Sequence, residues 1–283
     1  MDWGLAILLA AFQGVAEFLP ISSSGHLRVL EEMSGTRPDV LFDLMLHLGT
    51  LAAVVIVYRA ILGRLLAATG RALRRPGHLR EQWRLEPDLR VVAWTLVACV
   101  PTGVLAILFE KRVDAVMTPA FVGVDLIVTG LLLLSIRYFQ ARRETSGRAI
   151  EDLRLRDALV VGTFQGISAV FRGVSRSGST ISSGLASGLR QDAAATFSFV
   201  LSIPAVLGAF LVKLKSASES GFHNVPWAQG IVGAAVAAIV GYFALTWLIR
   251  VLQKGRLHLF AIYCFCAGVA VIVWSLVRTV PAA

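Results

Sequence analysis

Two polar clusters interrupt an otherwise apolar sequence, and the first combines residue types that can perform acid–base and nucleophilic chemistry. Gln13 and Glu17 are four positions apart, so a helix would place both side chains on one face. A serine-rich stretch, Ser22 to His26, follows closely; Pro20 to Gly25 should break the helix, and a second short helix is expected from His26 to Met33. A serine hydroxyl beside a carboxylate or an imidazole is the arrangement of an activated nucleophile. The spacing therefore makes Glu17, His26 and the three serines Ser22, Ser23 and Ser24 candidate catalytic groups.

The second cluster repeats the first about half a chain later. Phe164-Gln165-Gly166 matches Phe12-Gln13-Gly14, and after a one-residue insertion Val174 to Ser179 aligns with Ile21 to His26. A guanidinium in such a loop suits a phosphate, and the free N–H groups of a helix start favour an anion. We therefore expect a phosphate site built from Arg176 and, around it, Gln13, Ser22, Ser24, Ser175, Ser177, Gly178 and Thr180.

The differences between the copies are informative. The first copy has Glu17 and His26 where the second has Ala169 and Ser179, and the second has Arg176 where the first has Ser23. One copy thus holds the acid, base and hydroxyl groups, while the other holds a positive clamp. Phosphoryl transfer needs this division, because its catalysis is mostly positioning and neutralisation of charge. A symmetric ion pathway would not need it.

Each of these residues also has a structural interpretation. Gln13 could hold helices together, Glu17 could be solvated near the membrane surface, and the serines could only cap a helix. His26 could be a packed core histidine, and Arg176 could pair with Glu17 instead of a phosphate.

Three further polar residues are weaker candidates. Asp43 and His47 are four positions apart, and they belong either to the site or to a helix start with a packed histidine. Asp125 is a lone acid in an apolar stretch, which favours a structural partner.

The composition predicts an all-α, multi-pass membrane protein. Of the 283 residues 56% are hydrophobic and only 16% are charged, against about 25% charged in a typical soluble domain. A transmembrane helix needs roughly 20 apolar residues. Such segments occur six times, at about 41–58, 91–109, 119–136, 193–212, 230–248 and 259–277.

The basic loops predict the topology. The net charge is +9, and most of the arginines lie in the loops 59–90, 137–156 and 250–258, as expected for cytoplasmic loops. All three loops fall on one side only if 1–35 and 158–190 do not cross the membrane. We therefore predict two re-entrant hairpins, with both termini and the site opening outside. We find no basic, soluble domain in the sequence, so the positive net charge does not predict a nucleic-acid partner.

The repeat extends beyond the motifs, because Phe42 to Gly49 aligns with Phe197 to Pro204. We expect repeat one at about 1–58 and repeat two at about 158–213, in opposite orientation within a single membrane domain, 1–283. Inverted repeats with broken helices place their binding site between the repeats near the midplane. The tips of both hairpins should therefore form one site.

The motifs resemble those of a known family. The segments are Gln13-x-x-x-Glu17, Pro20 to His26 and Gly173 to Thr180, and they are similar to the (E/Q)xxxE, serine-rich Gly-His and PGxSRSxxT motifs of the BacA/UppP undecaprenyl-diphosphate phosphatases. The resemblance runs over essentially the whole chain. It implies a bacterial inner-membrane hydrolase that converts undecaprenyl diphosphate into the monophosphate carrier lipid of peptidoglycan synthesis. Resistance to bacitracin, which sequesters the substrate, goes with the family.

The resemblance also implies roles for single residues. Ser23 is then the nucleophile, His26 an alternative base or nucleophile, and Arg176 the phosphate ligand. Gln13 and Glu17 would hold a loosely bound Mg²⁺ or Ca²⁺, although many members have Glu at position 13. Arg172 replaces the Pro of the third motif, which loosens a turn and adds a cation. The implied partners are the substrate and membrane lipids, with a homodimer as a possible assembly.

A second function, in a different class, is a polyprenyl-phosphate flippase or transporter. Inverted repeats with half-helices are transporter architecture. The unequal distribution of catalytic groups between the two copies favours the enzyme.

Overall fold

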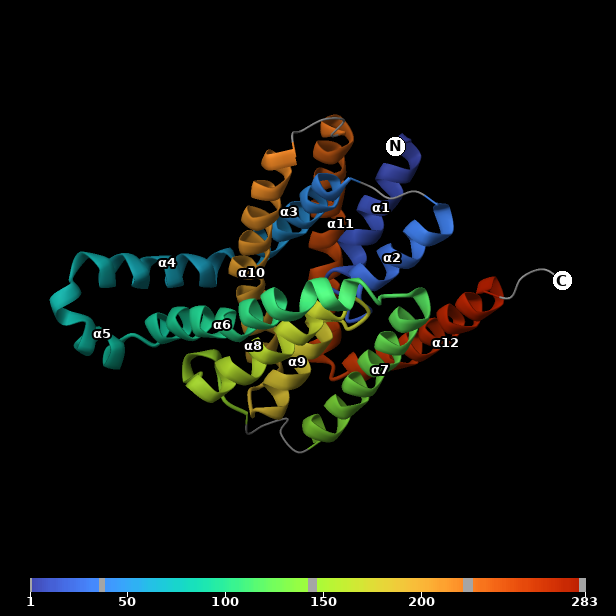
Figure 1. Ribbon diagram of the computed structural model, residues 1–283. Coiled ribbons are helices and arrows are strands. Elements are labelled where there is room, and N and C mark those ends of the chain that lie inside the picture. The colour runs from blue at the N-terminus through green and yellow to red at the C-terminus, as the bar shows by residue number, and fades with distance from the viewer. Residues whose placement is uncertain (1, 36–38, 142–146, 221–225, 280–283) are drawn as a thin grey trace.

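The computed structural model describes residues 2–35, 39–141, 147–220 and 226–279, and within these ranges the chain forms helices and no β-sheet (Figure 1). The predicted all-α class is confirmed. Residues 142–146, within the second basic loop, lie outside the described residues.

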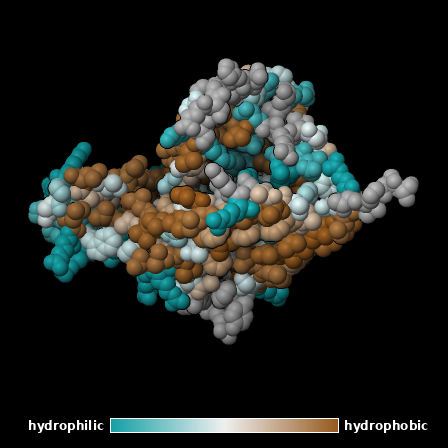
Figure 2. Space-filling model, viewed as in Figure 1, coloured by the Kyte–Doolittle hydropathy of each residue, from teal (hydrophilic) through white to brown (hydrophobic). Residues whose placement is uncertain are grey.

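Six helices of the described chain are long and apolar enough to cross a membrane. They are α3 (Val40–Val57), α6 (Pro87–Asp114), α7 (Pro119–Ala141), α10 (Gln191–Ser220), α11 (Trp227–Gln253) and α12 (Phe260–Thr279). Each predicted span falls on one of them. Their outer faces keep large apolar side chains exposed, as with Ile107 at 84% and Leu211 at 64%, and such side chains cover much of the face seen in Figure 2. The chain is a multi-pass membrane protein.

The first broken segment consists of α1 (Trp3–Ala16) and α2 (Ser23–Ser34). The second helix begins three residues before His26, the start that the sequence predicted. The reason is the cap: the Ser22 hydroxyl accepts a hydrogen bond from the Gly25 N–H, which satisfies a free donor of the first turn.

The second broken segment is built in the same way from α8 (Leu155–Val170) and α9 (Arg176–Ala186). Ser175, the counterpart of Ser22 in the repeat, caps α9 by accepting from the Gly178 N–H at 3.2 Å. The four short helices have 14, 12, 16 and 11 residues, fewer than a full span needs. Re-entrant insertion of both segments stays a prediction.

Close helix crossings explain the glycine in each motif. A side chain at Gly14 would meet the Ala237 carbonyl of α11, and one at Gly166 would meet Leu105 of α6. Small residues let membrane helices approach closely. Helix α1 is therefore packed tightly on α11, and its counterpart α8 is packed tightly on α6.

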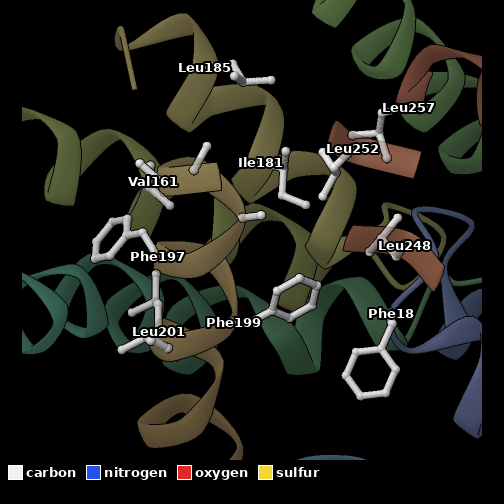
Figure 3. Close-up of a cluster of buried hydrophobic side chains, with 14 of the residues drawn as sticks. Phe18, Val161, Ile181, Leu185, Phe197, Phe199, Leu201, Leu248, Leu252 and Leu257 are labelled. Atoms are coloured by element: carbon white, nitrogen blue, oxygen red, sulfur yellow. The ribbon is translucent and has the colours of Figure 1, made fainter. Parts of the chain in front are cut away.

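The turn that joins α1 to α2 is anchored in the main core. Phe18 is fully buried and lies 5.8 Å from Phe199 of α10 between ring centroids. Figure 3 shows these rings beside Ile181 of α9 and Leu248 of α11. Because side chains from both halves of the chain pack here, the core fixes one break relative to the other.

The first basic loop is largely helical. It forms α4 (Arg59–Arg74), a 3₁₀ turn (Pro76–His78) and α5 (Leu79–Leu85), which project sideways together with the start of α6 (Figure 1). Arg71 donates hydrogen bonds to Glu86, and these hold the pKa of that carboxyl below its usual range. The ion pair ties the end of α4 to the residue that precedes α6.

Candidate active site

The two helix breaks meet, although about half the chain separates them. The hydroxyls of Ser22 and Ser24 both donate to the Arg172 carbonyl, at 2.6 and 2.7 Å. From the other side, the Ser177 hydroxyl donates to the Leu19 carbonyl at 3.4 Å. The structure thus brings the two sequence motifs together into one cluster.

Glu17 is the centre of this cluster. Its Oε2 accepts hydrogen bonds from Gln13 Nε2 at 3.0 Å and from the Ser23 hydroxyl at 2.7 Å. Its Oε1 accepts from Arg176 at 2.7 Å. His47 Nε2, which the sequence left undecided, lies 3.8 Å from Oε2. One carboxylate therefore connects the hydroxyl of the first repeat to the guanidinium of the second.

Burial makes the pair of Glu17 and Arg176 strongly interdependent. Their side chains are only 9% and 19% exposed, so each charge relies on the other in a medium of low dielectric constant. The structural interpretation of Arg176 as a partner of Glu17 is thus realised. It leaves room for a ligand, because a guanidinium has five N–H donors.

Two polar atoms, one on each side of Glu17, have no protein partner in the described chain. They are Nη1 of Arg176, a donor, and Oε1 of Gln13, an acceptor, and both are buried. Buried polar groups are nearly always hydrogen-bonded, so such exceptions indicate a ligand or an ordered water. A phosphate oxygen would satisfy the arginine N–H.

Ser23 is aimed at Glu17 by an unusual backbone. Ser22, the residue before it, has φ of 68°, and no other non-glycine residue in the described ranges has a positive φ. Such a conformation costs about 1–3 kcal/mol and persists only where surrounding contacts impose it. Here the cap to Gly25 and the bond to the Arg172 carbonyl impose it.

The side chain of His26 is hydrogen-bonded to groups other than the Glu17 carboxylate. Its Nδ1 is 2.8 Å from the Ser22 carbonyl oxygen, and its Nε2 is 2.9 Å from the Tyr263 hydroxyl. The ring lies between Phe12 and Tyr263, with centroid distances of 5.6 Å to each. Of the two candidate bases for Ser23, the hydrogen bonding favours Glu17.

Helix α7 holds the turn that leads into Arg176, the first residue of α9. Asp125 accepts from the Gly173 N–H at 3.2 Å, so this lone acid has the structural partner that we expected. The Thr129 hydroxyl donates to the Gly173 carbonyl and accepts from the Ser175 N–H. Sequence reasoning missed Thr129, because a single threonine in an apolar helix carries no distinctive pattern.

The remaining predicted phosphate-site residues mainly stabilise the second turn. Ser175 caps α9, and Gly178 supplies the capped N–H. Thr180 is within hydrogen-bonding distance of Ser198, at 2.5 Å between hydroxyl oxygens. Because the hydroxyls of Ser175 and Thr180 are used in this way, these residues position the loop. Their direct contact with a phosphate stays a prediction.

A small, partly open pocket lies between α3 and α10 and reaches the pair of Glu17 and Arg176. Its other lining residues are Phe18, Thr50, Leu51, Val54, Ser202 and Val206. The cavity thus has a charged end and largely apolar walls. An anionic group would meet the guanidinium of Arg176 at the charged end of this pocket.

A divalent cation fits this site only together with a substrate. The described residues contain no group of three or more His, Cys, Asp or Glu side chains that could hold a metal. Glu17 and the unpaired Oε1 of Gln13 offer two oxygen ligands. Mg²⁺ is commonly held by one or two carboxylates plus substrate phosphates.

Comparison with known proteins was decisive for the family. The model of the family described as "Bacitracin resistance protein BacA" matches residues 6–270, which include both motifs. The chain belongs to the BacA family. The resemblance found in the sequence is thereby confirmed over nearly its whole length.

Curated relatives in this family carry the name undecaprenyl-diphosphatase. The protein of Desulfatibacillum aliphaticivorans is 37% identical over 98% of this chain and 100% of its own length. That of Halothermothrix orenii is 37% identical over 94% and 96%, and that of Desulfosudis oleivorans is 40% identical over 93% and 94%. The similarity therefore covers both repeats.

Proposed function

We propose that this protein hydrolyses undecaprenyl diphosphate to undecaprenyl phosphate and inorganic phosphate. The observation that carries the proposal is the contact of Ser23 and Arg176 with the two oxygens of Glu17, at the end of a cavity with apolar walls. The names of the BacA-family relatives support the substrate.

The reaction follows from the hydrogen bonds. Glu17 accepts the proton of the Ser23 hydroxyl as its Oγ attacks the terminal phosphorus, and the bond from that phosphorus to the bridging oxygen breaks. Undecaprenyl phosphate leaves, and water then hydrolyses the phosphoserine to release phosphate and restore the hydroxyl. Arg176 neutralises the charge on the transferring group, the main requirement of such a transition state. Attack by a water that Glu17 orients is the alternative.

A divalent cation would be shared between protein and substrate. Glu17 and Gln13 would hold Mg²⁺ or Ca²⁺ against the diphosphate oxygens, where the ion would neutralise charge. Since Gln13 contributes no carboxylate, we expect a weak, substrate-dependent requirement. Phosphate release measured against metal concentration, with and without saturating substrate, tests this.

The cavity gives the polyprenyl tail a sideways exit. It opens between α3 and α10, and the exposed apolar side chains of these two helices include Val55, Ile56, Leu207 and Leu211. The tail can therefore remain in the surrounding lipid while the diphosphate reaches Arg176. We expect the enzyme to tolerate shorter polyprenyl chains, because no closed pocket measures their length.

The location of the site in the cell is part of the proposal. We expect the bacterial inner membrane, with the basic loops in the cytoplasm, both termini outside and the site opening outward. Membrane lipids surround the chain, and a homodimer is a possible assembly. Cross-linking in native membranes tests the dimer.

Phosphate release by the purified protein in detergent tests the activity. A flippase breaks no phosphate bond and would release no phosphate, and detergent offers no compartments between which it could transport. Release from undecaprenyl diphosphate with Mg²⁺ present supports the phosphatase, while its absence from folded protein contradicts it. The unequal site groups of the two repeats do not favour the flippase.

A further inference from the structure

We propose that Tyr263, on the last helix, is a positioning residue that keeps the Ser23 hydroxyl aimed at Glu17 through His26 and Ser22. This inference rests on the proposed function for its catalytic consequence. It gives α12, the last helix of the chain, a role in a site whose reacting groups lie near the start of the sequence.

The hydrogen bonds determine which nitrogen of His26 carries the proton. Its Nδ1 is 2.8 Å from the carbonyl oxygen of Ser22, and a carbonyl can only accept, so Nδ1 holds the hydrogen. In the neutral ring Nε2 is then an acceptor, and it receives the Tyr263 hydroxyl at 2.9 Å. Tyr263 therefore stabilises the tautomer that the Ser22 carbonyl selects, and it fixes the plane of the ring, which also stacks on it.

The same ring holds the strained residue beside the candidate nucleophile. The Nδ1–H of His26 binds the carbonyl of Ser22, whose φ of 68° is unfavourable for a residue with a side chain. The next residue is Ser23, which must donate to Glu17 over 2.7 Å. Rotation of the Ser22–Ser23 peptide would turn that hydroxyl away, and the bond from His26 opposes this rotation.

A second contact from α12 supports the same role. The thiol of Cys264, the next residue, lies 3.4 Å from the Pro20 carbonyl, within the first break. Neighbouring residues of α12 thus hold both the break and the start of α2. Tyr263 is 43% exposed, so its hydroxyl is not needed to fill the core.

Tyr263→Phe tests the proposal, because it removes the hydroxyl and keeps the stacked ring. We expect kcat for phosphate release to fall about five- to tenfold, the size of one hydrogen bond, with KM within twofold and an unchanged unfolding temperature. The matched control is Tyr242→Phe on α11, where no hydrogen bond of the hydroxyl is found in the described structure; full activity is expected. In a His26→Gln background, Tyr263→Phe should have no further effect, since residues that act through one another are not additive.

Nitrogen NMR of ¹⁵N-histidine-labelled protein gives a readout independent of activity. We expect the His26 signals, identified by their loss in His26→Gln, to show the Nδ1–H tautomer in the wild type and a mixture in Tyr263→Phe. A wild-type Nε2–H tautomer, or Tyr263→Phe with full activity, would overturn the proposal. If the wild type releases no phosphate, the proposed function fails, while the tautomer still decides whether Tyr263 positions His26.

Discussion

At the scale of single residues, Glu17 determines how the site is built. It accepts from Gln13, Ser23 and Arg176, and its side chain is 9% exposed. Three donors from separate residues therefore hold this buried carboxylate in one orientation. The same contacts make it both the candidate base and the structural link between the two repeats.

Removing Arg176 should therefore destabilise the protein as well as inactivate it. Arg176→Ala leaves Glu17 as an uncompensated buried charge, which typically costs about 3–5 kcal/mol. We expect a lower unfolding temperature in detergent. The double variant Glu17→Gln/Arg176→Ala should recover part of that loss, because no charge is then left unpaired. If the double variant is no more stable than Arg176→Ala, the pair is not coupled as described.

Arg176→Lys separates charge from geometry. Lysine retains the positive charge but lacks the planar fork that can bind Glu17 and a phosphate at once. We expect most of the stability to remain and kcat to fall at least tenfold. Thermal unfolding and steady-state phosphate release, measured on one preparation, check both parts, and wild-type kcat in the lysine variant would contradict the role of the fork.

At the scale of elements, the helix breaks were predictable and their supports were not. Pro20, the serines and the glycines marked both breaks in the sequence, and the two serine caps follow from known preferences. The sequence placed the start of α2 three residues too late, because it gave no sign that Ser22 would adopt a positive φ. Thr129, Thr50 and Ser202 were missed, since a lone hydroxyl in an apolar helix gains its role only from the residue packed against it.

The support of the second break by α7 can be tested at Gly173. An added Cβ there would lie 2.4 Å from the Cβ of Asp125 and 2.6 Å from the Val122 carbonyl oxygen, so Gly173→Ala must displace the turn before Arg176. We expect lower stability and a large loss of kcat. The matched control is Gly103→Ala in α6, where the space is open and alanine is the better helix former. Equal stability and activity in the two variants would contradict the close packing.

At the scale of the whole molecule, both halves of the chain contribute to one site. The first break supplies Glu17 and Ser23, the second supplies Arg176, and α3 and α10 form the cavity between them. The sequence predicted the six spans from the length of the apolar segments, and the meeting of the motifs from the repeat. The packing of Phe18 on Phe199 could not be read in advance, because it depends on how two distant segments face one another.

The orientation in the membrane makes a separate prediction. In a variant without Cys99, Cys264 and Cys266, we expect a cysteine at Ser24 to react with a membrane-impermeant maleimide added outside intact cells. A cysteine at Arg74, in the basic arm, should react only after permeabilisation, since that loop is expected in the cytoplasm. The reverse pattern would place the site on the cytoplasmic side.

The central claim is that Glu17 and Ser23 form the reacting pair, and turnover of undecaprenyl diphosphate by matched variants tests it most directly. Phosphate release should be measured in detergent for the wild type, Ser23→Ala, Glu17→Gln and, as a control on the exposed end of α2, Glu32→Gln. We predict that kcat falls by about 10²–10⁴ in Ser23→Ala and in Glu17→Gln, with little change in KM. Glu32→Gln should keep wild-type turnover. Full activity in either Ser23→Ala or Glu17→Gln, in protein that remains folded, would contradict the account.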